Sequence, residues 1–400
     1  MTARGPNGTR KHLSGNSASR VPKLSLNLGD YPMKTLLKCI IAGLAMILAR
    51  PALAEITVTD VKGREVTLAA PAKRVILNFY YEDYIAVVGP GAMDKVVALS
   101  LSTWKDWRPK QFAKYLEAIP AISDIPDVGD AENGTFSAEK VIAAKPDLVI
   151  LGAWTYDAMG DTVRQIEQAG IPVVTLDYNA QTVEKHVLST EVLGKVMGAE
   201  ERAAKLADNY RSAMADIDAR IKAAGPTTKK VYVELAQKGA GEVGNSYGDS
   251  MWGALIDKLG GINIAKGQIG NWGPLSPEYV LAQKPDLIFL AGSEWVNKPQ
   301  SVQVGFGADP KVTRERMAGY LGRPGWSGLP AVQQGGVHAI YHGGARTLSD
   351  YVYAQYIAKQ LYPEAFKDVH PARNIERYYD TWLPIKAEGV FVLPYVAAGQ

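Results

Sequence analysis

A twenty-residue segment occurs twice in this chain, once in each half. The segment GTFSAEKVIAAKPDLVILGA covers Gly134–Ala153, and GPLSPEYVLAQKPDLIFLAG covers Gly273–Gly292. Aligned without gaps at an offset of 139, the two copies match at ten of their twenty positions. A fold that contains this segment twice must hold two similar substructures, so the repeat favours a molecule built from two related halves.

Each copy of the segment predicts a short helix followed by a buried strand. Ser137 and Ser276 are typical N-cap residues, and Pro277 suits the first helical position, where its missing N–H would have no partner. The Lys-Pro pairs at 145–146 and 284–285 end the helices, because a residue before proline avoids helical dihedral angles. The apolar runs DLVIL and DLIFL then follow as buried strands.

One acidic residue recurs in the two copies, as Glu139 and Glu278. Both fall in the first helical turn, where the helix dipole favours a carboxylate. Capping alone accounts for that position, and duplication can copy a capping residue that has no external role. The residues by themselves leave two interpretations open: a local capping role and an exposed functional pair.

The rest of the chain alternates between strand and helix patterns. Further β-branched runs lie at 74–78, 94–100, 171–177, 229–235 and 336–341, and helical patterns at 161–170, 251–261 and 350–363. Strands that alternate with helices indicate βαβ units and mainly parallel sheets. Between the halves, 182–225 has only helical pattern, and 26 residues over 199–224 would form a helix about 39 Å long. The predicted fold class is α/β: two Rossmann-like lobes with mainly parallel sheets, joined by a long rigid helix, with a ligand cleft between them.

The N-terminal region has the pattern of an export signal. From Met33 the sequence gives a positive start at Lys34 and Lys38, a short apolar core, and an A-x-A site that predicts cleavage after Ala54. A lone membrane anchor is the alternative, but the apolar run is shorter than the roughly 20 residues of a spanning helix. We expect 1–32 to be a disordered extension or a mis-assigned start, 33–54 a signal peptide, 55–198 the N-terminal lobe, 199–225 the interlobe helix and 226–400 the C-terminal lobe.

Removal of the signal changes both charge and cysteine content. Residues 1–54 hold eight of the 44 Lys and Arg residues and one of the 41 Asp and Glu residues, which leaves 36 basic and 40 acidic residues. The mature chain therefore has no basic excess that would indicate nucleic acid. The only cysteine, Cys39, lies inside the signal, so the mature chain excludes disulfides, thiolate metal sites and cysteine nucleophiles.

The order and spacing of these segments resemble a known family. The repeated SxExVxAxKPDLVIL pattern, LIDKLGGINIA at 255–265, RPGWSGLPAVQQGGVHAI at 323–340 and LSDYVYAQYIAKQLYP at 348–363 are similar to the substrate-binding proteins of ABC importers for iron–siderophores, haem and cobalamin. The resemblance covers about Ile56 to Tyr379. It implies a periplasmic protein, monomeric and without a cofactor, that captures a metal chelate and delivers it to importer membrane subunits driven by a cytoplasmic ATPase. A ferric siderophore is the expected ligand, with haem, cobalamin and other metal complexes as alternatives. The resemblance also implies that Glu139 and Glu278 dock onto arginines of the importer.

The carboxyl ends of the strands are where an open α/β sheet binds its ligand, and aromatic residues follow several of them. Aromatic side chains suit a large, flat or partly apolar ligand, although each can equally pack under a loop. An arginine here can form bidentate bonds to carboxylates of an anionic chelate, and Tyr341 or His342 can reach a metal that its chelator leaves partly open. The candidate ligand contacts are Tyr80, Tyr81, Trp154, Tyr156, Tyr247, Trp295, Tyr341, His342 and Arg346.

Three other functions are alternatives to the capture of a ligand for import. A periplasmic adaptor that presents its ligand to a sensor would have the same fold, but only import requires Glu139 and Glu278 together. A free-metal binder needs several inward histidines and carboxylates, and four histidines in the mature chain are few for a Zn or Mn site. An enzyme is not expected, because the sequence has no G-x-S-x-G, H-E-x-x-H or P-loop motif.

Overall fold

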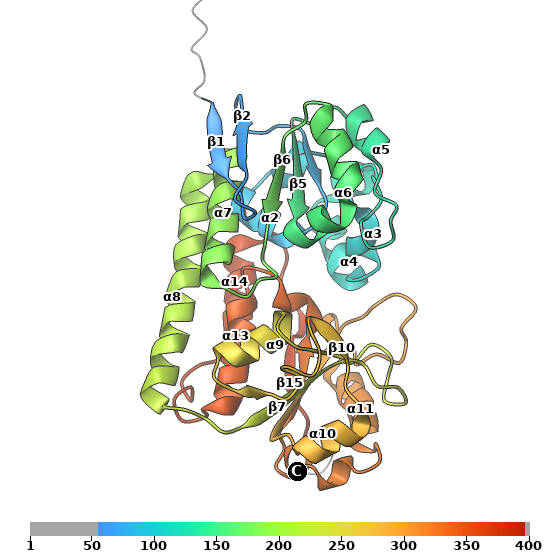
Figure 1. Cartoon of the computed structure of the whole chain (residues 1–400), viewed down its shortest axis with the longest axis vertical. Helices are drawn as coiled ribbons and strands as arrows, with labels where there is room; N and C mark the ends of the chain where they lie inside the picture. The colour runs from blue at the N-terminus through green and yellow to red at the C-terminus, as the bar shows by residue number, and fades with distance from the viewer. Residues whose placement is uncertain (1–54, 397–400) are drawn as a thin grey trace, which may run out of the picture. The chain divides into compact units, whose positions relative to one another are not determined.

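The computed structural model describes residues 55–396. The predicted extension, signal peptide and Cys39 lie outside these residues. Within them the chain has two α/β lobes, and α8 (Glu200–Ala224) runs along one side of both (Figure 1). No helix among residues 55–396 is long and apolar enough to cross a membrane.

The N-terminal lobe is built on a four-stranded parallel sheet in the order β4-β3-β5-β6. Its strands match the predicted ones: β3 (Val75–Leu77), β4 (Val96–Leu99), β5 (Leu148–Gly152) and β6 (Val173–Leu176). An antiparallel hairpin of β1 (Ile56–Thr59) and β2 (Glu65–Leu68), which the sequence analysis did not predict, begins the lobe. The helical segments are α2 (Tyr81–Val88), η1 (Ala92–Lys95), α3 (Leu101–Lys105), α4 (Pro109–Ala118), η2 (Pro120–Asp124), α5 (Ala138–Ala143) and α6 (Ala153–Gln168).

The C-terminal lobe repeats this topology and adds an edge strand. Its sheet has the order β15-β13-β11-β7-β9, in which only β15 (Val392–Pro394) is antiparallel to its neighbour. The strands β7 (Lys230–Leu235), β9 (Ile262–Asn263), β11 (Leu287–Gly292) and β13 (Val337–Tyr341) occupy the places of β3, β4, β5 and β6. Two small antiparallel pairs, β8 (Asn245–Tyr247) with β10 (Trp272–Pro274) and β12 (Gly305–Phe306) with β14 (Gly389–Val390), lie outside it. The helical segments are α9 (Met251–Lys258), α10 (Pro277–Gln283), α11 (Pro310–Leu321), η3 (Trp326–Gly328), α12 (Pro330–Gln333), η4 (His342–Ala345), α13 (Asp350–Leu361) and α14 (Pro371–Trp382).

The repeated segment forms the same unit in both lobes, as predicted. Ser137 caps α5 by accepting a hydrogen bond from the backbone N–H of Lys140, and Ser276 caps α10 in the same way. Lys145 and Lys284, the residues before proline, both adopt left-handed dihedral angles, with φ of 48° and 51°. Each unit then continues into a strand, β5 or β11, that lies beside the first strand of its own sheet.

Two helices lead from the first lobe to the second. Thr182 caps α7 (Val183–Met197), and Gly198 ends it in the left-handed conformation. The 25 residues of α8 then span about 37 Å, which confirms the long predicted helix. Its buried face includes Leu206, Tyr210 and Ile217, part of the predicted stripe.

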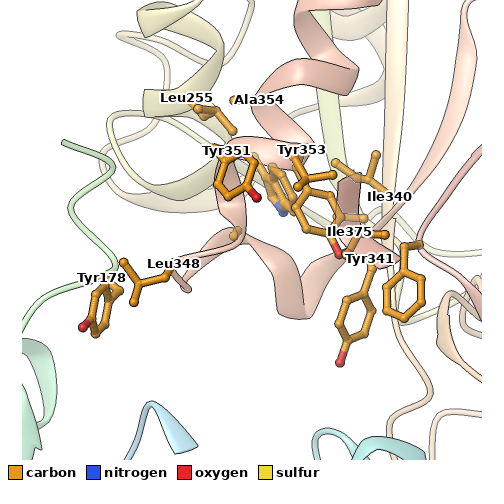
Figure 2. Close-up of a cluster of buried hydrophobic side chains, with 14 of the residues drawn as sticks. Tyr178, Leu255, Ile340, Tyr341, Leu348, Tyr351, Tyr353, Ala354 and Ile375 are labelled. Atoms are coloured by element: carbon orange, nitrogen blue, oxygen red, sulfur yellow. The ribbon is translucent and has the colours of Figure 1, made fainter. Parts of the chain in front are cut away.

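The main hydrophobic core is continuous between the lobes. It contains residues of both sheets, and Tyr178, after β6, lies beside Leu348, before α13 (Figure 2). A second, smaller cluster around Val149 and Val163 fills the space between the N-terminal sheet and α6. The described residues, 55–396, accordingly belong to one compact unit, and the lobe boundaries given by the sequence stay a prediction.

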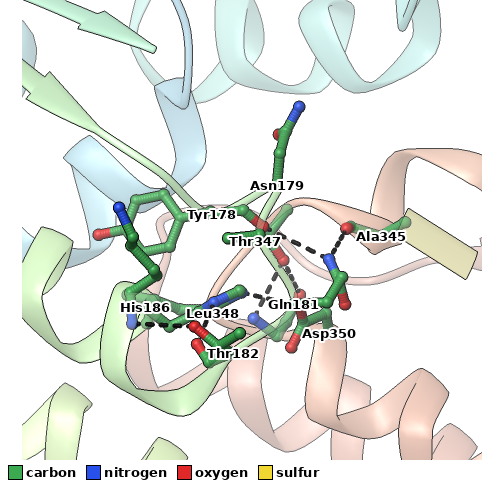
Figure 3. A network of polar contacts seen from close by, with 12 residues as sticks. Tyr178, Asn179, Gln181, Thr182, His186, Ala345, Thr347, Leu348 and Asp350 are labelled. Carbon is green, nitrogen blue, oxygen red and sulfur yellow. Dashed lines mark hydrogen bonds and ion pairs between the residues drawn. The ribbon is translucent and has the colours of Figure 1, made fainter. Parts of the chain in front are cut away.

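Buried polar contacts fasten the lobes together around this shared core. His186 of α7 lies 2.8 Å from the Asp350 carboxylate at the start of α13, and Gln181 donates to the Ala345 carbonyl (Figure 3). The Asp83 carboxylate of α2 accepts a hydrogen bond of 2.7 Å from the backbone N–H of Leu348. Because His186, Asp350 and Asp83 are all buried, these contacts are shielded from water and hold the lobes in a defined relation.

Candidate ligand-binding site

A cavity of about 1070 Å³ lies between the lobes, where the strands of both sheets end. The strand order reverses at β3 in one lobe and at β7 in the other, and the carboxyl ends of strands at such a point form a crevice. Residues that follow the central strands line the cavity from both sides. The lining residues are Asp106, Trp107, Arg108, Glu132, Asn133, Trp154, Asn179, Leu235, Gln237, Tyr247, Ser250, Met251, Asn271, Trp272, Ser293, Trp295, Val296, Lys298, His342, Gly343 and Arg346.

Five of the nine candidate ligand contacts lie on this cavity. Trp154 begins α6 directly after β5, and Trp295 follows β11 in the equivalent place of the other lobe. Tyr247 ends β8, while His342 and Arg346 come from the turn after β13. The structure therefore places these five strand-end residues on one cavity. Their contact with a ligand stays a prediction.

The other four candidates lie outside the cavity lining. Tyr81 is buried, stacks on Trp104 and donates its hydroxyl to backbone carbonyls of its own lobe. Tyr341 packs edge to face against Phe391 in the C-terminal core. Tyr156 faces the β1–β2 hairpin, where Arg64 stacks over its ring at 4.2 Å.

Tyr80, the fourth, supports a residue of the cavity instead of lining it. Its hydroxyl donates to the side-chain oxygen of Asn179, which is on the lining, at 3.1 Å. The backbone of Tyr80 is left-handed, with φ of 58°, although the residue is large and buried. Met251, which lines the cavity, has φ of 46°. Such conformations are unfavourable for residues other than glycine, and they tend to occur at binding sites.

Two arginines, one from each lobe, make the interior of the cavity electropositive. Arg108 and Arg346 are both half-buried, and neither forms an ion pair with a carboxylate within residues 55–396. Arg108 donates to the Gly343 carbonyl at 3.2 Å, and the Arg346 guanidinium lies over the Phe79 ring at 5.2 Å. Burial, followed by the nearby charge of Arg108, lowers the pKa of Arg346 to about 10. Burial opposes the charge of Arg108 too, but the acidic groups of Tyr341, Glu82 and Asp83 outweigh it and raise the pKa of Arg108. The repulsion therefore falls mainly on Arg346, and an anion beside its guanidinium would relieve that cost.

Two buried donors on the lining have no hydrogen-bond partner within the described part of the chain. They are the indole Nε1–H of Trp154 and the Nε–H of Arg346. Buried donors are nearly always satisfied in folded proteins, so an unpaired pair on one cavity indicates that something else accepts from them. An oxygen acceptor, from a water molecule or from a ligand, would complete both donors.

His342 has the electrostatic environment of a neutral side chain. Burial, followed by the charges of Arg346 and Arg108, keeps the pKa of His342 well below its ordinary value. Its Nδ1 accepts from the Trp252 indole at 3.4 Å, and Trp can only donate, so the ring hydrogen lies on Nε2. His342 is therefore a neutral residue of the lining that carries a hydrogen-bond donor on Nε2. Coordination of a chelated metal through Nε2 would require the other tautomer and the loss of the bond from Trp252.

No group of three or more His, Cys, Asp or Glu side chains suited to a metal ion occurs within residues 55–396.

The α3–α4 segment contributes to the cavity wall, which the sequence pattern does not reveal. Trp107 and Arg108 line the cavity because this segment follows β4, whose carboxyl end lies in the same crevice. The sequence KDWRPKQ at 105–111 is typical of a helix start, and Pro109 does begin α4, but nothing in it distinguishes a helix start from a cavity wall. Asn179, after β6, was missed in the same way, because the strand-end argument was not applied to β4 and β6.

The α3–α4 segment also bridges the lobes at the side of the cavity. Lys110 forms an ion pair of 2.5 Å with Glu294, which is almost buried, and the Val296 N–H donates to the Asp106 carbonyl at 3.1 Å. Lys114 reaches Glu388 at 2.5 Å. These bonds place Trp107 and Arg108 against the C-terminal lobe and so complete the cavity wall.

Known proteins share this architecture. A TroA-like periplasmic binding protein, FepB, from Veillonella parvula superposes with a TM-score of 0.81 at 33% identity, over 85% of this chain and all of that one. The molybdate-binding protein MolA of Haemophilus influenzae is 25% identical over 369 residues, 85% of this chain and 94% of its own. An uncharacterised ABC transporter substrate-binding lipoprotein of Bacillus subtilis, YvrC, is 24% identical over 322 residues, 78% of this chain and 87% of its own. Residues 75–341 match the family described as periplasmic binding protein, and the chain belongs to that family, whose members are binding proteins of ABC importers.

Proposed function

We propose that this protein captures an anionic ferric chelate, a ferric siderophore, and delivers it to an ABC importer. The observation that carries the proposal is a pair of guanidiniums without an ion-pair partner in the described residues, Arg108 and Arg346, which lie on one cavity and come from opposite lobes. Arginine forks match carboxylate, catecholate or hydroxamate oxygens, and the unpaired N–H of Trp154 adds another donor for such oxygens.

The size of the cavity favours a chelate over a bare oxyanion. MolA, by its name, binds molybdate, and two arginines would also suit an oxyanion of that kind. A tetrahedral oxyanion, however, displaces the volume of only a few water molecules, each about 30 Å³. A cavity of about 1070 Å³ matches ligands at the upper end of ordinary small-molecule sites. The four tryptophans on the lining add apolar surface that a small oxyanion would not use.

The ligand can be identified on protein recovered directly from the periplasm. We expect a native mass increment with a ligand-to-metal charge-transfer band of a ferric chelate in the visible spectrum. A Soret band would instead identify haem, and a molybdenum signal with no organic mass increment would identify an oxyanion; either result would contradict the siderophore proposal.

The two arginines provide the matching binding test. Arg108→Gln together with Arg346→Gln should weaken binding of the recovered ferric chelate by at least a hundredfold, since each lost charge-assisted pair is worth about 1.5–3 kcal/mol. The control is Arg373→Gln, because Arg373 is exposed on α14 and outside the cavity. Calorimetric titration checks the affinities. An affinity within threefold of the unmodified protein would show that the ligand does not depend on the cationic pair.

Delivery to the importer is proposed to use Glu139 and Glu278. Both side chains are exposed on first helical turns, one in each lobe, and neither forms an ion pair within residues 55–396. Two accessible carboxylates on one compact unit can set orientation and association rate by charge complementarity. A ligand-presenting sensor of the same fold is the alternative and would not need both.

The docking proposal predicts a separation of transport from binding. Glu139→Ala with Glu278→Ala should abolish chelate uptake by cells and leave the affinity of the purified protein unchanged. Glu117→Ala with Glu315→Ala is a matched pair of exposed glutamates, one in each lobe, and should transport normally. Normal uptake by the Glu139 and Glu278 double variant would contradict the docking role.

Export is proposed to remove the first 54 residues and release a monomer into the periplasm. The intact mass of the periplasmic protein should correspond to a chain that begins at Glu55. Its native mass without ligand should be that of one chain, and a mass that includes residues 33–54 would instead indicate a retained anchor.

A further inference from the structure

Two of the large apolar side chains on the cavity lining are exposed to solvent. Trp272 is 56% exposed and Val296 is 44% exposed, and both belong to the cavity lining. The other large hydrophobic residues exposed to a similar degree within 55–396, Ile142, Ile262 and Val396, do not line it. Met251, half-buried, lies on the same lining. We call Trp272, Val296 and Met251 the apolar ledge.

Trp272 lies in an antiparallel pair of short strands, β8 and β10, which α9 and β9 separate in the sequence. It pairs with Tyr247 in this ladder, so the two side chains project from the same face, and both line the cavity. The end of the ladder is held by a hydrogen bond from the Gly248 N–H to the Asn271 carbonyl and by one from the Ser250 hydroxyl to the same carbonyl. A Cβ atom at Gly248 would lie only 1.9 Å from the Gly270 carbonyl oxygen, so only glycine permits this approach.

The strand pair therefore holds the backbone of Trp272 in a defined place beside the cavity. A side chain on a disordered loop would lose more of its binding free energy to ordering than one on a preorganised strand. The backbone of Met251, which begins α9 shortly after β8, has a left-handed φ of 46°, a further unfavourable conformation that the surrounding structure maintains.

The apolar ledge and the two arginines give the cavity an apolar region and a cationic region. Arg108 and Arg346 are half-buried between the lobes, whereas Trp272 and Val296 are open to solvent. A ligand that filled both regions would place anionic oxygens inward and an apolar surface outward. It would bury the exposed faces of the ledge, a gain proportional to the apolar area removed from water.

We propose that the apolar ledge selects anionic chelates with aromatic arms, and that Trp272 is its specificity-determining residue. The inference rests on the proposed function and narrows it. The Trp272 ring stacks on an aromatic arm of the chelate, which an aliphatic chelate of equal charge cannot offer. Aromatic contacts of this kind contribute about 0.5–1.5 kcal/mol beyond the area that they bury.

The test uses two kinetically inert, trianionic complexes of the same octahedral shape, chromium(III) tris(catecholate) and chromium(III) tris(oxalate). Each has six oxygen ligands, and only the first has aromatic arms. Calorimetric titration of the full protein should give about tenfold tighter binding of the catecholate complex. Trp272→Ala should remove most of that preference and leave oxalate affinity within twofold, while Trp272→Phe, which keeps a flat ring, should retain most of it.

Ile262→Ala is the matched control, since Ile262 is 45% exposed in the same lobe but outside the cavity, and it should change neither affinity. Equal weakening of both complexes by Trp272→Ala, or no weakening of either, would overturn the role of Trp272 and leave the proposed function intact. If the unmodified protein binds neither complex, the proposed capture of anionic chelates fails, and the inference fails with it. Circular dichroism verifies that each variant is folded.

Discussion

A buried histidine illustrates how single residues in this protein set its response to pH. His338, on β13, is 4% exposed, and its Nδ1 lies 2.9 Å from the Tyr356 hydroxyl. Burial, with a smaller contribution from Lys229, lowers the pKa of His338 to about 4. The folded protein therefore keeps this ring neutral under conditions in which the unfolded chain would protonate it.

The consequence is a loss of stability in mild acid. Because the folded pKa lies below the unfolded value of 6.5, the contribution of His338 is fully present above pH 6.5 and is lost as the pH falls from 6.5 towards 4. Between pH 7.5 and pH 5 this amounts to about 2 kcal/mol of the free energy of unfolding. Urea denaturation should show a smaller difference between the two pH values for His338→Gln than for the unmodified protein.

His370→Gln serves as the control for that measurement, because His370 is exposed before α14. The same reduction in both variants would show that the effect does not come from burial of His338.

The binding site shows what can be inferred from residue types and what cannot. Trp154, Tyr247, Trp295, His342 and Arg346 were placed by one rule, that ligands lie beyond the carboxyl ends of strands. The rule cannot tell which of two adjacent side chains turns inward. Tyr80, Tyr81 and Tyr341 sit at the same strand ends, yet they pack into the protein or support Asn179. Trp272 begins β10, a short strand whose pairing with β8 the sequence pattern does not reveal.

At the scale of elements, the repeat contains an aspartate whose role the structure makes clear. Asp147 accepts hydrogen bonds of 2.9 Å from the backbone N–H groups of Lys73 and Arg74, which immediately precede β3. Asp286 accepts one of 2.7 Å from Lys230, at the start of β7. In each lobe the residue after the Lys-Pro pair therefore fastens the repeated unit to the first strand of its sheet.

Both aspartates should therefore contribute to stability in the same way. Asp147→Ala and Asp286→Ala are each expected to lower the free energy of unfolding by about 1–2 kcal/mol, because backbone donors lose a charged acceptor near the surface. Asp→Asn keeps one acceptor oxygen and should recover part of the loss at both sites. Urea denaturation measures these differences, and an asparagine as damaging as alanine would show that the hydrogen bonds are not the cause.

Long periodic elements were predictable, and short ones were not. All seven predicted strands are present in the sheets, because each is a continuous apolar run buried on both faces. The β1–β2 hairpin, the β8–β10 strand pair and the edge strand β15 were not predicted. They have only three or four residues each, and tertiary contacts, more than local pattern, determine their pairing.

For the whole molecule, the important feature is that two lobes share one core. Tyr178 of the first lobe and Leu348 of the second belong to the same buried cluster, and Asp83, His186 and Asp350 add buried polar bonds between the lobes. The repeat predicts two halves, but it says nothing of how they pack, because residues at their junction lie outside the repeated segment. A shared core favours small relative movements of the lobes around the cavity over wide opening.

This continuity predicts a single cooperative unfolding transition. In calorimetry of ligand-free protein, the measured and van't Hoff enthalpies should agree, since neither lobe can lose its core without exposing that of the other. Leu348→Ala at the junction and Val163→Ala within the N-terminal lobe both remove buried methyl groups. Each substitution should lower the midpoint temperature of the single transition by about 2–6 °C, and the transition should show no shoulder. A second transition that responds to Val163→Ala but not to Leu348→Ala would show that the lobes unfold independently, and the lobes could then also move independently when they close on the chelate.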